Sequence, residues 1–178
     1  MDLVDGRETI DLVTADGARA LLPQLAALLQ DAVDDGASIG FLRPLSSGEA
    51  RRYWTGVADE VAQGARLLLV ARVGERVVGS AQLGLCTRPN GLHRAEVQKV
   101  MVHTSHRGRG AGKRLMQAVE AAARAAGRRL LYLDTEPDRP AEAMYVRLGY
   151  ARAGAIPDYA CTPDGTLHPT VIYYKQLA

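Results

Sequence analysis

The sequence is poor in the residues that build metal centres and disulfide frameworks. It has two cysteines, Cys86 and Cys161, without C-x-x-C spacing, and its four histidines lack the spacings of zinc ligands. We therefore expect no metal ion. We interpret the cysteines as reduced thiols of a cytoplasmic protein, although their spacing also allows a bridge.

Long hydrophobic runs and a strong net charge are also absent. The longest apolar run, residues 67–71, is far shorter than the ~20 residues that span a bilayer, and the charged residues near the N-terminus do not resemble a signal peptide. The net charge of +2 predicts neither a membrane nor a nucleic-acid partner. Segment 88–114 is basic, but it has no aromatic residue to stack on bases, which argues against a single-stranded nucleic-acid binder.

Charge is nevertheless unevenly distributed along the chain. Glu96 is the one acid between residues 88 and 114, whereas acids are prominent between residues 134 and 164. This distribution suits an enzyme with an anionic cofactor and a cationic substrate. The alternative for the acidic part is an ordinary solvated surface.

The hydrophobic patterns predict a mixed α/β protein. The 178 residues are most simply one domain, 1–178, with a sizeable core. The patterns predict the order β-α-α-β-β-β-α-β-α-β-β. The expected strands are 9–13, 66–73, 76–86, 94–103, 129–134, one beginning at 149, and 170–177; the expected helices end near residues 34, 64, 126 and 148.

Several local signals add detail to this order. Thr14 or Asp16 can cap the first helix, and Pro23 fits its first turn or a kink. Ser46 followed by Glu49 is a capping box for the second helix. Residues 157–169 are expected to form a long irregular loop. Phe41, in the loop between the first two helices, is either a hydrophobic plug, which we favour, or a ligand contact.

The most informative stretch is a glycine-rich turn between a predicted strand and a predicted helix. Gly108, Gly110 and Gly112 let the backbone bend and approach a ligand closely. A turn that opens a helix directs unpaired N–H groups toward one point, which predicts a site for an anion such as phosphate. Basic residues flank the turn at positions 107, 109, 113 and 114.

The two familiar phosphate loops do not fit this turn. A Walker loop requires Ser or Thr after Gly112-Lys113, and Arg114 stands there. A dinucleotide fingerprint starting at Gly108 or Gly110 requires a third glycine where Lys113 or Leu115 stands. What remains is Arg107-x-x-Gly110-x-Gly112 after a strand.

This pattern resembles the acetyl-CoA motif R/Q-x-x-G-x-G/A of the GNAT superfamily of acyltransferases. The predicted element order is similar to the GNAT fold, a mixed and strongly twisted sheet with two helices after the first strand. Ala141-x-x-x-Tyr145-x-x-x-Gly149-Tyr150 resembles a second signature of the family. Asp138 stands where the family usually has an Asn that helps to hold the pantetheine arm, so that contact departs from the family pattern.

Further segments resemble the tabtoxin-resistance branch of the family, whose enzyme acetylates a β-lactam amino-acid toxin. They are residues 36–41, 89–92, 94–99, 133–136 and 162–170. The resemblance implies acetyl-CoA as cosubstrate, held by the following residues: Met101, Val102, Arg107, Gly108, Arg109, Gly110, Ala111, Gly112, Lys113 and Asp138. A shared branch does not determine which molecule is acetylated.

Acetyl transfer to an amine requires a base, because a free alkyl amine has a pKa of about 10 and is mostly protonated at neutral pH. Glu96 is the first candidate, and Asp134, at the end of the next strand, is the second. Period-two alternation predicts that Glu96, Gln98 and Val100 share one face. The structural alternatives are a surface ion pair of Glu96 with Arg94 or Lys99, and a capping role for Asp134.

Tyr145 is the candidate general acid for the departing thiolate, and a core tyrosine is the alternative. A bulge in the strand before the glycine turn would leave an N–H group free to polarise the thioester carbonyl. Substrate contacts are expected from Phe41, Gln98, Tyr159 and His168, and a structural role is an equal alternative for His168.

The leading hypothesis is therefore a cytoplasmic acetyl-CoA-dependent N-acetyltransferase acting on a small amine, as a monomer or homodimer. Alternatives are a CoA-binding sensor without turnover, or a GNAT enzyme acting on an aminoglycoside, a polyamine or a protein N-terminus.

Overall fold

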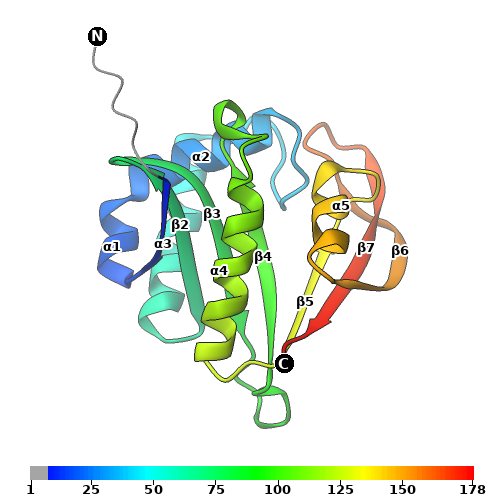
Figure 1. Cartoon of the computed structure of the whole chain (residues 1–178). Coiled ribbons are helices and arrows are strands. Elements are labelled where there is room, and N and C mark those ends of the chain that lie inside the picture. Colours follow the sequence, from blue (N-terminus) through cyan, green and yellow to red (C-terminus); the bar gives the residue numbers. More distant parts are fainter. Residues whose placement is uncertain (1–7) are drawn as a thin grey trace.

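The computed structural model describes residues 8–178 as one seven-stranded sheet flanked by helices (Figure 1). The strand order is β1-β2-β3-β4-β5-β7-β6, and β4–β5 is the parallel pair among antiparallel neighbours. The strands are β1 (Glu8–Val13), β2 (Arg66–Val73), β3 (Arg76–Leu85), β4 (Arg94–Val102), β5 (Leu130–Thr135), β6 (Ala151–Cys161) and β7 (Leu167–Gln176). The α-helices are α1 (Ala15–Ala20), α2 (Leu22–Asp34), α3 (Ser47–Ala62), α4 (Ala111–Ala125) and α5 (Pro140–Arg147).

Two apolar layers, one on each face of the sheet, hold the elements together. Leu115, Met116 and Val119 of α4 pack with Tyr145 of α5 on one face. Residues of α1, α2 and α3 pack on the other face, where Trp54 is fully buried. The predicted mixed α/β architecture is confirmed.

The first helical stretch is two helices rather than the one helix that the sequence predicts. Helix α1 ends at Ala20, Leu21 lies between the helices, and α2 begins at Leu22. Pro23 occupies the first turn of α2, where its missing N–H group has no intrahelical partner to lose. The capping box of Ser46 and Glu49 is present at α3 as predicted.

The predicted irregular loop 157–169 is wrong, because most of it belongs to a long hairpin. β6 continues through Pro157 to Cys161, and β7 begins at Leu167. The β6–β7 register shifts between Ile156 and Ala160, and β6 is the edge strand of the sheet. Edge strands and bulges are among the places where a sheet tolerates proline.

The sheet opens at its centre, between β4 and β5. Only Arg94–Glu96 on β4 pair with Leu130–Tyr132 on β5, although β4 continues to Val102 and β5 to Thr135. Figure 1 shows β4 and β5 diverging between α4 and α5. This divergence exposes the second half of β4 to the space where the candidate site lies.

Candidate active site

A cleft of about 970 Å³ occupies the opening between β4 and β5. Its walls are the second half of β4, the end of β5, the first turn of α4, α5 and the loop between α2 and α3. Most of the predicted site residues line it: Glu96, Gln98, Met101, Val102, Arg107, Gly108, Gly110, Ala111, Gly112, Lys113, Asp134, Tyr145, Tyr159 and His168. Residues from distant parts of the chain therefore meet around one cavity.

One end of the cleft is formed by the start of α4. Gly110 precedes the helix with φ +80°, a left-handed conformation that costs other residues strain. A Cβ on Gly112 would lie 3.2 Å from the sulfur of Met144, so this glycine allows α4 and α5 to approach closely. The first N–H groups of α4 therefore lie at the cleft, an arrangement that suits an anion.

The basic residues of the turn differ in how they are engaged. The Arg107 guanidinium forms an ion pair with Asp35 and donates to the carbonyl oxygen of Val102 (3.1 Å). Lys113 lines the cleft and is exposed, so its ammonium group can meet a bound phosphate. Arg109 does not line the cleft.

A bulge reshapes β4 beside this turn. Lys99 and Val100 lie opposite the single residue Ala81, because Ser80 pairs with Met101 and Gln82 with Gln98. Lys99 has φ +48°. The bulge reverses the alternation of faces, so Val100 packs with Val97 in the α4 layer. The prediction that Val100 shares a face with Glu96 and Gln98 is therefore wrong.

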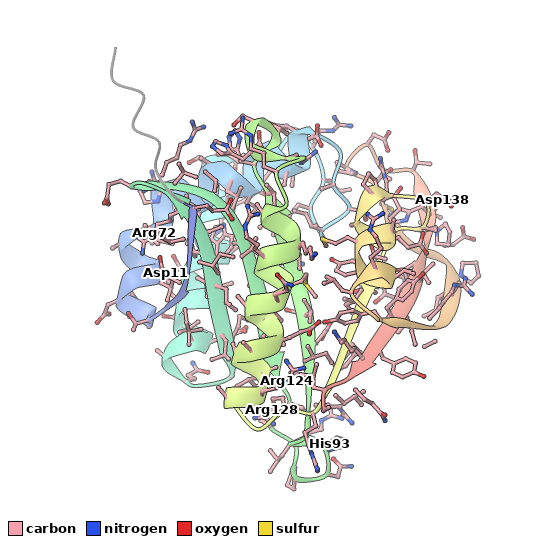
Figure 2. All side chains as sticks on the ribbon, viewed as in Figure 1. Asp11, Arg72, His93, Arg124, Arg128 and Asp138 are labelled. Atoms are coloured by element: carbon pink, nitrogen blue, oxygen red, sulfur yellow. The ribbon has the colours of Figure 1, made fainter. Side chains whose placement is uncertain are left out.

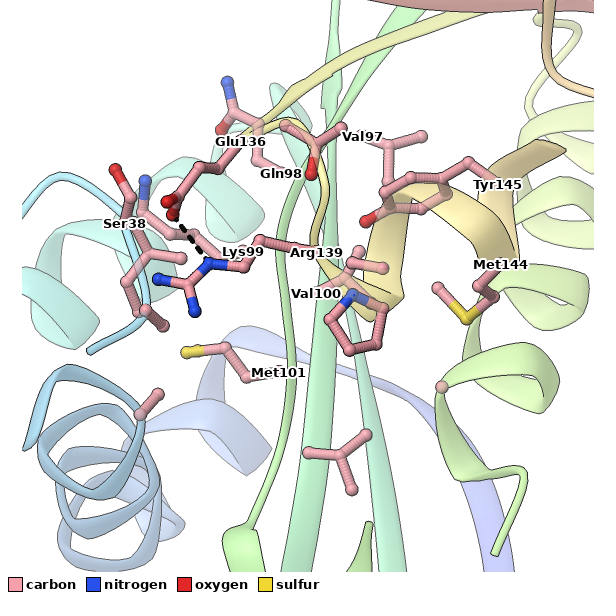
Figure 3. Close-up of a pocket in the computed structure, with 18 of the residues that line it drawn as sticks. Ser38, Val97, Gln98, Lys99, Val100, Met101, Glu136, Arg139, Met144 and Tyr145 are labelled. Atoms are coloured by element: carbon pink, nitrogen blue, oxygen red, sulfur yellow. Dashed lines mark ion pairs between the residues drawn. The ribbon is translucent and has the colours of Figure 1, made fainter. Parts of the chain in front are cut away.

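Tyr145 lies on the opposite wall, on α5. Figure 3 shows its ring facing β4 across the cleft. Burial, and to a smaller extent the negative charge of Asp134, raises the pKa of the Tyr145 phenol above its usual value. The phenol is therefore a stable hydrogen-bond donor at neutral pH.

The two candidate bases, Glu96 and Asp134, both line the cleft. The carboxylate of Glu96 lies 3.5 Å from the Tyr132 hydroxyl, and within residues 8–178 it forms no ion pair with Arg94 or Lys99. Asp134 accepts a hydrogen bond from the Thr170 hydroxyl (3.0 Å). Glu96 thus has the less occupied carboxylate of the two.

The predicted substrate contacts divide into two groups. His168 lines the cleft, donates from Nδ1 to the carbonyl oxygen of Pro169 (2.8 Å) and accepts the Ser38 hydroxyl at Nε2 (2.8 Å). Tyr159 lines the cleft from β6 and is exposed. Phe41 does not line the cleft and packs edge-on against Tyr53 with ring centroids 5.2 Å apart, as a hydrophobic plug would.

Asp138, the predicted pantetheine contact, also lies outside the cleft. Its φ is +60°, and its N–H group donates to Glu142 (2.8 Å). Figure 2 shows Asp138 at the far side of α5, away from β4. A short carboxylate side chain suits this left-handed turn, since Asp and Asn tolerate positive φ better than most residues.

A polar cluster beside the cleft was not expected from the sequence. Arg66 donates to Glu60 (2.5 Å), Gln82 (2.6 Å) and Gln98 (2.5 Å), and the Tyr53 hydroxyl donates to Gln82 (3.1 Å). Lys99 also lines the cleft, as do Glu136 and Arg139, whose ion pair (3.2 Å) is dashed in Figure 3. In the sequence, the one signal for this cluster is a polar residue in each of three successive strands: Arg66 in β2, Gln82 in β3 and Gln98 in β4.

Within residues 8–178 no group of His, Cys, Asp and Glu is arranged to hold a metal ion, and no helix of that range is long and apolar enough to cross a membrane. The arrangement thus combines an anion-binding helix start, a phenol donor and carboxylates around one cleft. Such a set can hold an anionic cosubstrate and accept a proton from a nucleophile.

Solved structures with the same fold are acetyltransferases. A putative acetyltransferase of Salmonella typhimurium, yncA, solved with its cofactor acetyl-CoA, has a TM-score of 0.77 and 20% identity, covering 96% of this chain and 94% of that chain. A ribosomal-protein-alanine N-acetyltransferase of Brucella melitensis has a TM-score of 0.78 and 23% identity, covering 95% of this chain and 99% of that chain. These likenesses establish the fold.

Sequence relatives define the family. A protein of Azospirillum brasilense, named as an uncharacterized N-acetyltransferase in the hisH-hisA intergenic region, is 34% identical over 137 residues, covering 75% of this chain and 80% of that protein. The model of the acetyltransferase (GNAT) family matches residues 40–150. The match spans more than half of the chain, which therefore belongs to the GNAT family of acyltransferase enzymes.

Proposed function

We propose that the chain transfers the acetyl group of acetyl-CoA to an amine of a small molecule. The observation that carries this proposal is the opening between β4 and β5, because it brings the start of α4, the bulge of β4, Tyr145 and two carboxylates to one cleft. Acetyl-CoA would supply an activated thioester. A bound acetyl-CoA in the Salmonella typhimurium structure supports this choice of cosubstrate.

The cofactor end of the cleft fits the charged half of that molecule. The N–H groups after Gly110 and the ammonium group of Lys113 would hold the phosphates, and Met101 and Val102 would line the path of the pantetheine arm. Arg107 would act mainly by positioning the turn, since its guanidinium is already bound to Asp35 and to Val102.

The centre of the cleft supplies the proton transfers. Glu96 accepts the proton of the attacking amine, with Asp134 as the second candidate, while the new C–N bond forms and the C–S bond breaks. The β4 bulge supplies a backbone donor for the carbonyl oxygen. Tyr145 stabilises the departing thiolate by a hydrogen bond, because its raised pKa makes full proton transfer unfavourable.

The acceptor that we favour is an amino-acid-like molecule such as a β-lactam toxin or antibiotic, on the resemblance to the tabtoxin-resistance branch. Aminoglycosides, polyamines and protein N-termini are the alternative acceptors. We further propose that the protein acts in the cytoplasm as a monomer or homodimer.

The proposal is tested by calorimetry with acetyl-CoA and by a screen for thiol release over amino acids, β-lactam amino acids, aminoglycosides, polyamines and short peptides. We expect acetyl-CoA binding and thiol release with at least one class. Binding without release from any amine would instead indicate a CoA-binding sensor. Absence of acetyl-CoA binding would contradict both.

A further inference from the structure

Lys99 places an ammonium group on the wall of the cleft, from the most distorted point of β4. Its backbone has φ +48°, a conformation in which a lysine is strained, and strained residues concentrate at ligand sites. Its Nζ lies 5.9 Å from the centroid of the Tyr53 ring and 3.6 Å from the position of a Cβ built on Gly40. Figure 3 shows Lys99 on the side of the cleft away from Tyr145.

Lys99 differs from the other cations of the cleft in its partners. Arg66, Arg107 and Arg139 each form an ion pair with a carboxylate. Across residues 8–178, Lys99 has no carboxylate within ion-pair distance. Lys113 and Arg147 also line the cleft without such a partner, but both are exposed to water, whereas Lys99 is half-buried.

The surroundings of this ammonium group make the lack of a partner costly. Burial lowers the pKa of Lys99 and the charge of Arg66 lowers it further, while Asp134 and Glu96 act from a distance in the opposite direction. A buried charge is retained in proteins when it is paired with an opposite charge. An anion entering this end of the cleft would supply that pair.

We propose that Lys99 binds a carboxylate or similar anionic group of the acceptor, so that the acceptor is an amino-acid-like zwitterion whose amine faces Glu96. This inference rests on the proposed acetyl transfer and makes Lys99 its specificity-determining residue. The anion site is separate from the cofactor end, which has the start of α4 and Lys113 for its own negative charge.

The experiment compares amino acids with the amines obtained by removing their carboxylate, one pair at a time, by thiol release. We expect the wild type to prefer the amino acid of the best pair by at least tenfold in kcat/KM. Lys99→Met should raise KM for that amino acid about 10- to 100-fold, the value of a hydrogen bond to a charged group. The KM of Lys99→Met for the decarboxylated amine and for acetyl-CoA should stay near wild type. Lys99→Arg should restore part of the preference for the amino acid.

Lys113→Met is the matched control, since it removes the other unpaired lysine of the same cleft. It should raise KM for acetyl-CoA and leave the preference for the amino acid intact. A melting curve of each variant separates loss of folding from loss of recognition.

Two outcomes would overturn the inference. The wild type could prefer the decarboxylated amines, or Lys99→Met could keep the preference for the amino acid, with or without the lower melting temperature expected from a structural contact with Tyr53. In each of these cases thiol release still supports acetyl transfer. Absence of thiol release with every amine would overturn the proposed transfer and the inference with it.

Discussion

The Tyr145 hydroxyl faces the cleft from a phenol that burial keeps protonated. We predict that Tyr145→Phe lowers kcat about 10- to 100-fold, because the departing thiolate loses one hydrogen bond to a charged group. Acetyl-CoA affinity by calorimetry should stay near wild type. Tyr159→Phe, which removes a hydroxyl from the exposed wall of the same cleft, is the comparison; an equal loss in both variants would contradict a specific role of Tyr145.

Glu96 carries the second residue-level prediction. Glu96→Gln keeps the shape of the side chain but removes the proton acceptor, so we expect a 10²- to 10⁴-fold loss of kcat at neutral pH. The measurement is initial rate against pH with a fixed saturating acceptor. An unchanged profile would assign the base to Asp134, whose carboxylate accepts a bond from Thr170.

Many residues that line the cleft could be predicted from the sequence, because the glycine turn and the α5 signature each lie on one short segment. These two motifs did not indicate that Lys99 lines the cleft. Its exposure to the cleft depends on a bulge, and one inserted residue in β4 exchanges the two faces of the strand. Asp138, which the resemblance assigns to the pantetheine arm, does not line the cleft, and its positive φ could not be read from the sequence.

The first turn of α4 is the element on which, in the proposed function, cofactor binding depends. Gly110 has φ +80°, and a Cβ there would lie 3.0 Å from the guanidinium of Arg114. We predict that Gly110→Ala raises KM for acetyl-CoA about tenfold, because the first N–H groups of the helix are displaced from the ligand.

Gly127→Ala is the matched control at the other end of α4. Gly127 has φ +70° with no atom within 4 Å of the added Cβ, so the backbone strain is similar. We expect both variants to lose about 1 kcal/mol of unfolding free energy in urea. Only Gly110→Ala should change the KM for acetyl-CoA, and an equal change in both would assign the effect to general loss of stability.

Elements with a strong local signal were predicted well, and those with a weak signal were not. The capping box of Ser46 determines the start of α3 from within four residues, so the sequence alone was sufficient. The β6–β7 hairpin contains Pro157 in β6, and its register shifts between Ile156 and Ala160. A proline and a bulge both interrupt the regular alternation of side chains by which a strand is recognised in a sequence.

At the scale of the whole molecule, a largely buried ion pair joins α4 to β7. Lys175 on β7 donates to both carboxylate oxygens of Glu120 on α4 (2.7 and 2.8 Å) and to the carbonyl oxygen of Leu148 (2.7 Å). We predict that Lys175→Met lowers the unfolding free energy by about 3 kcal/mol, because Glu120 stays buried without its main partner.

Asp16→Asn is the control for this prediction, since the Asp16–Arg19 pair lies on the surface with the Asp16 side chain 96% exposed. Removing an exposed pair should change stability by less than about 1 kcal/mol in the same urea titration. Similar losses in the two variants would show that the Glu120–Lys175 pair contributes no more to the unfolding free energy than an exposed pair does.

Two buried tyrosines predict how stability depends on pH. Burial raises the pKa of both Tyr145 and Tyr150, so the folded state holds these phenol protons more tightly than the unfolded state. Their contribution to the unfolding free energy is complete below about pH 10, the pKa of tyrosine in an unfolded chain, and is lost as the pH rises above that value. In urea titrations between pH 8 and pH 11, the midpoint should decrease as the pH rises above about 10. The decrease should be smaller in Tyr150→Phe.

The pairing of β4 with β5 is the shortest ladder in the sheet, so the sheet is weakly joined at its centre. Residues 94–96 and 130–132 form the ladder that joins the two halves of the sheet, and the Glu120–Lys175 ion pair links α4 to β7. A ligand lying along the open part of β4 would contact both halves of the sheet and reduce their motion relative to each other. Acetyl-CoA should therefore slow amide exchange not only in residues 97–102 but also in residues 171–176 of β7, which lie beyond the two β7 residues that line the cleft, His168 and Thr170.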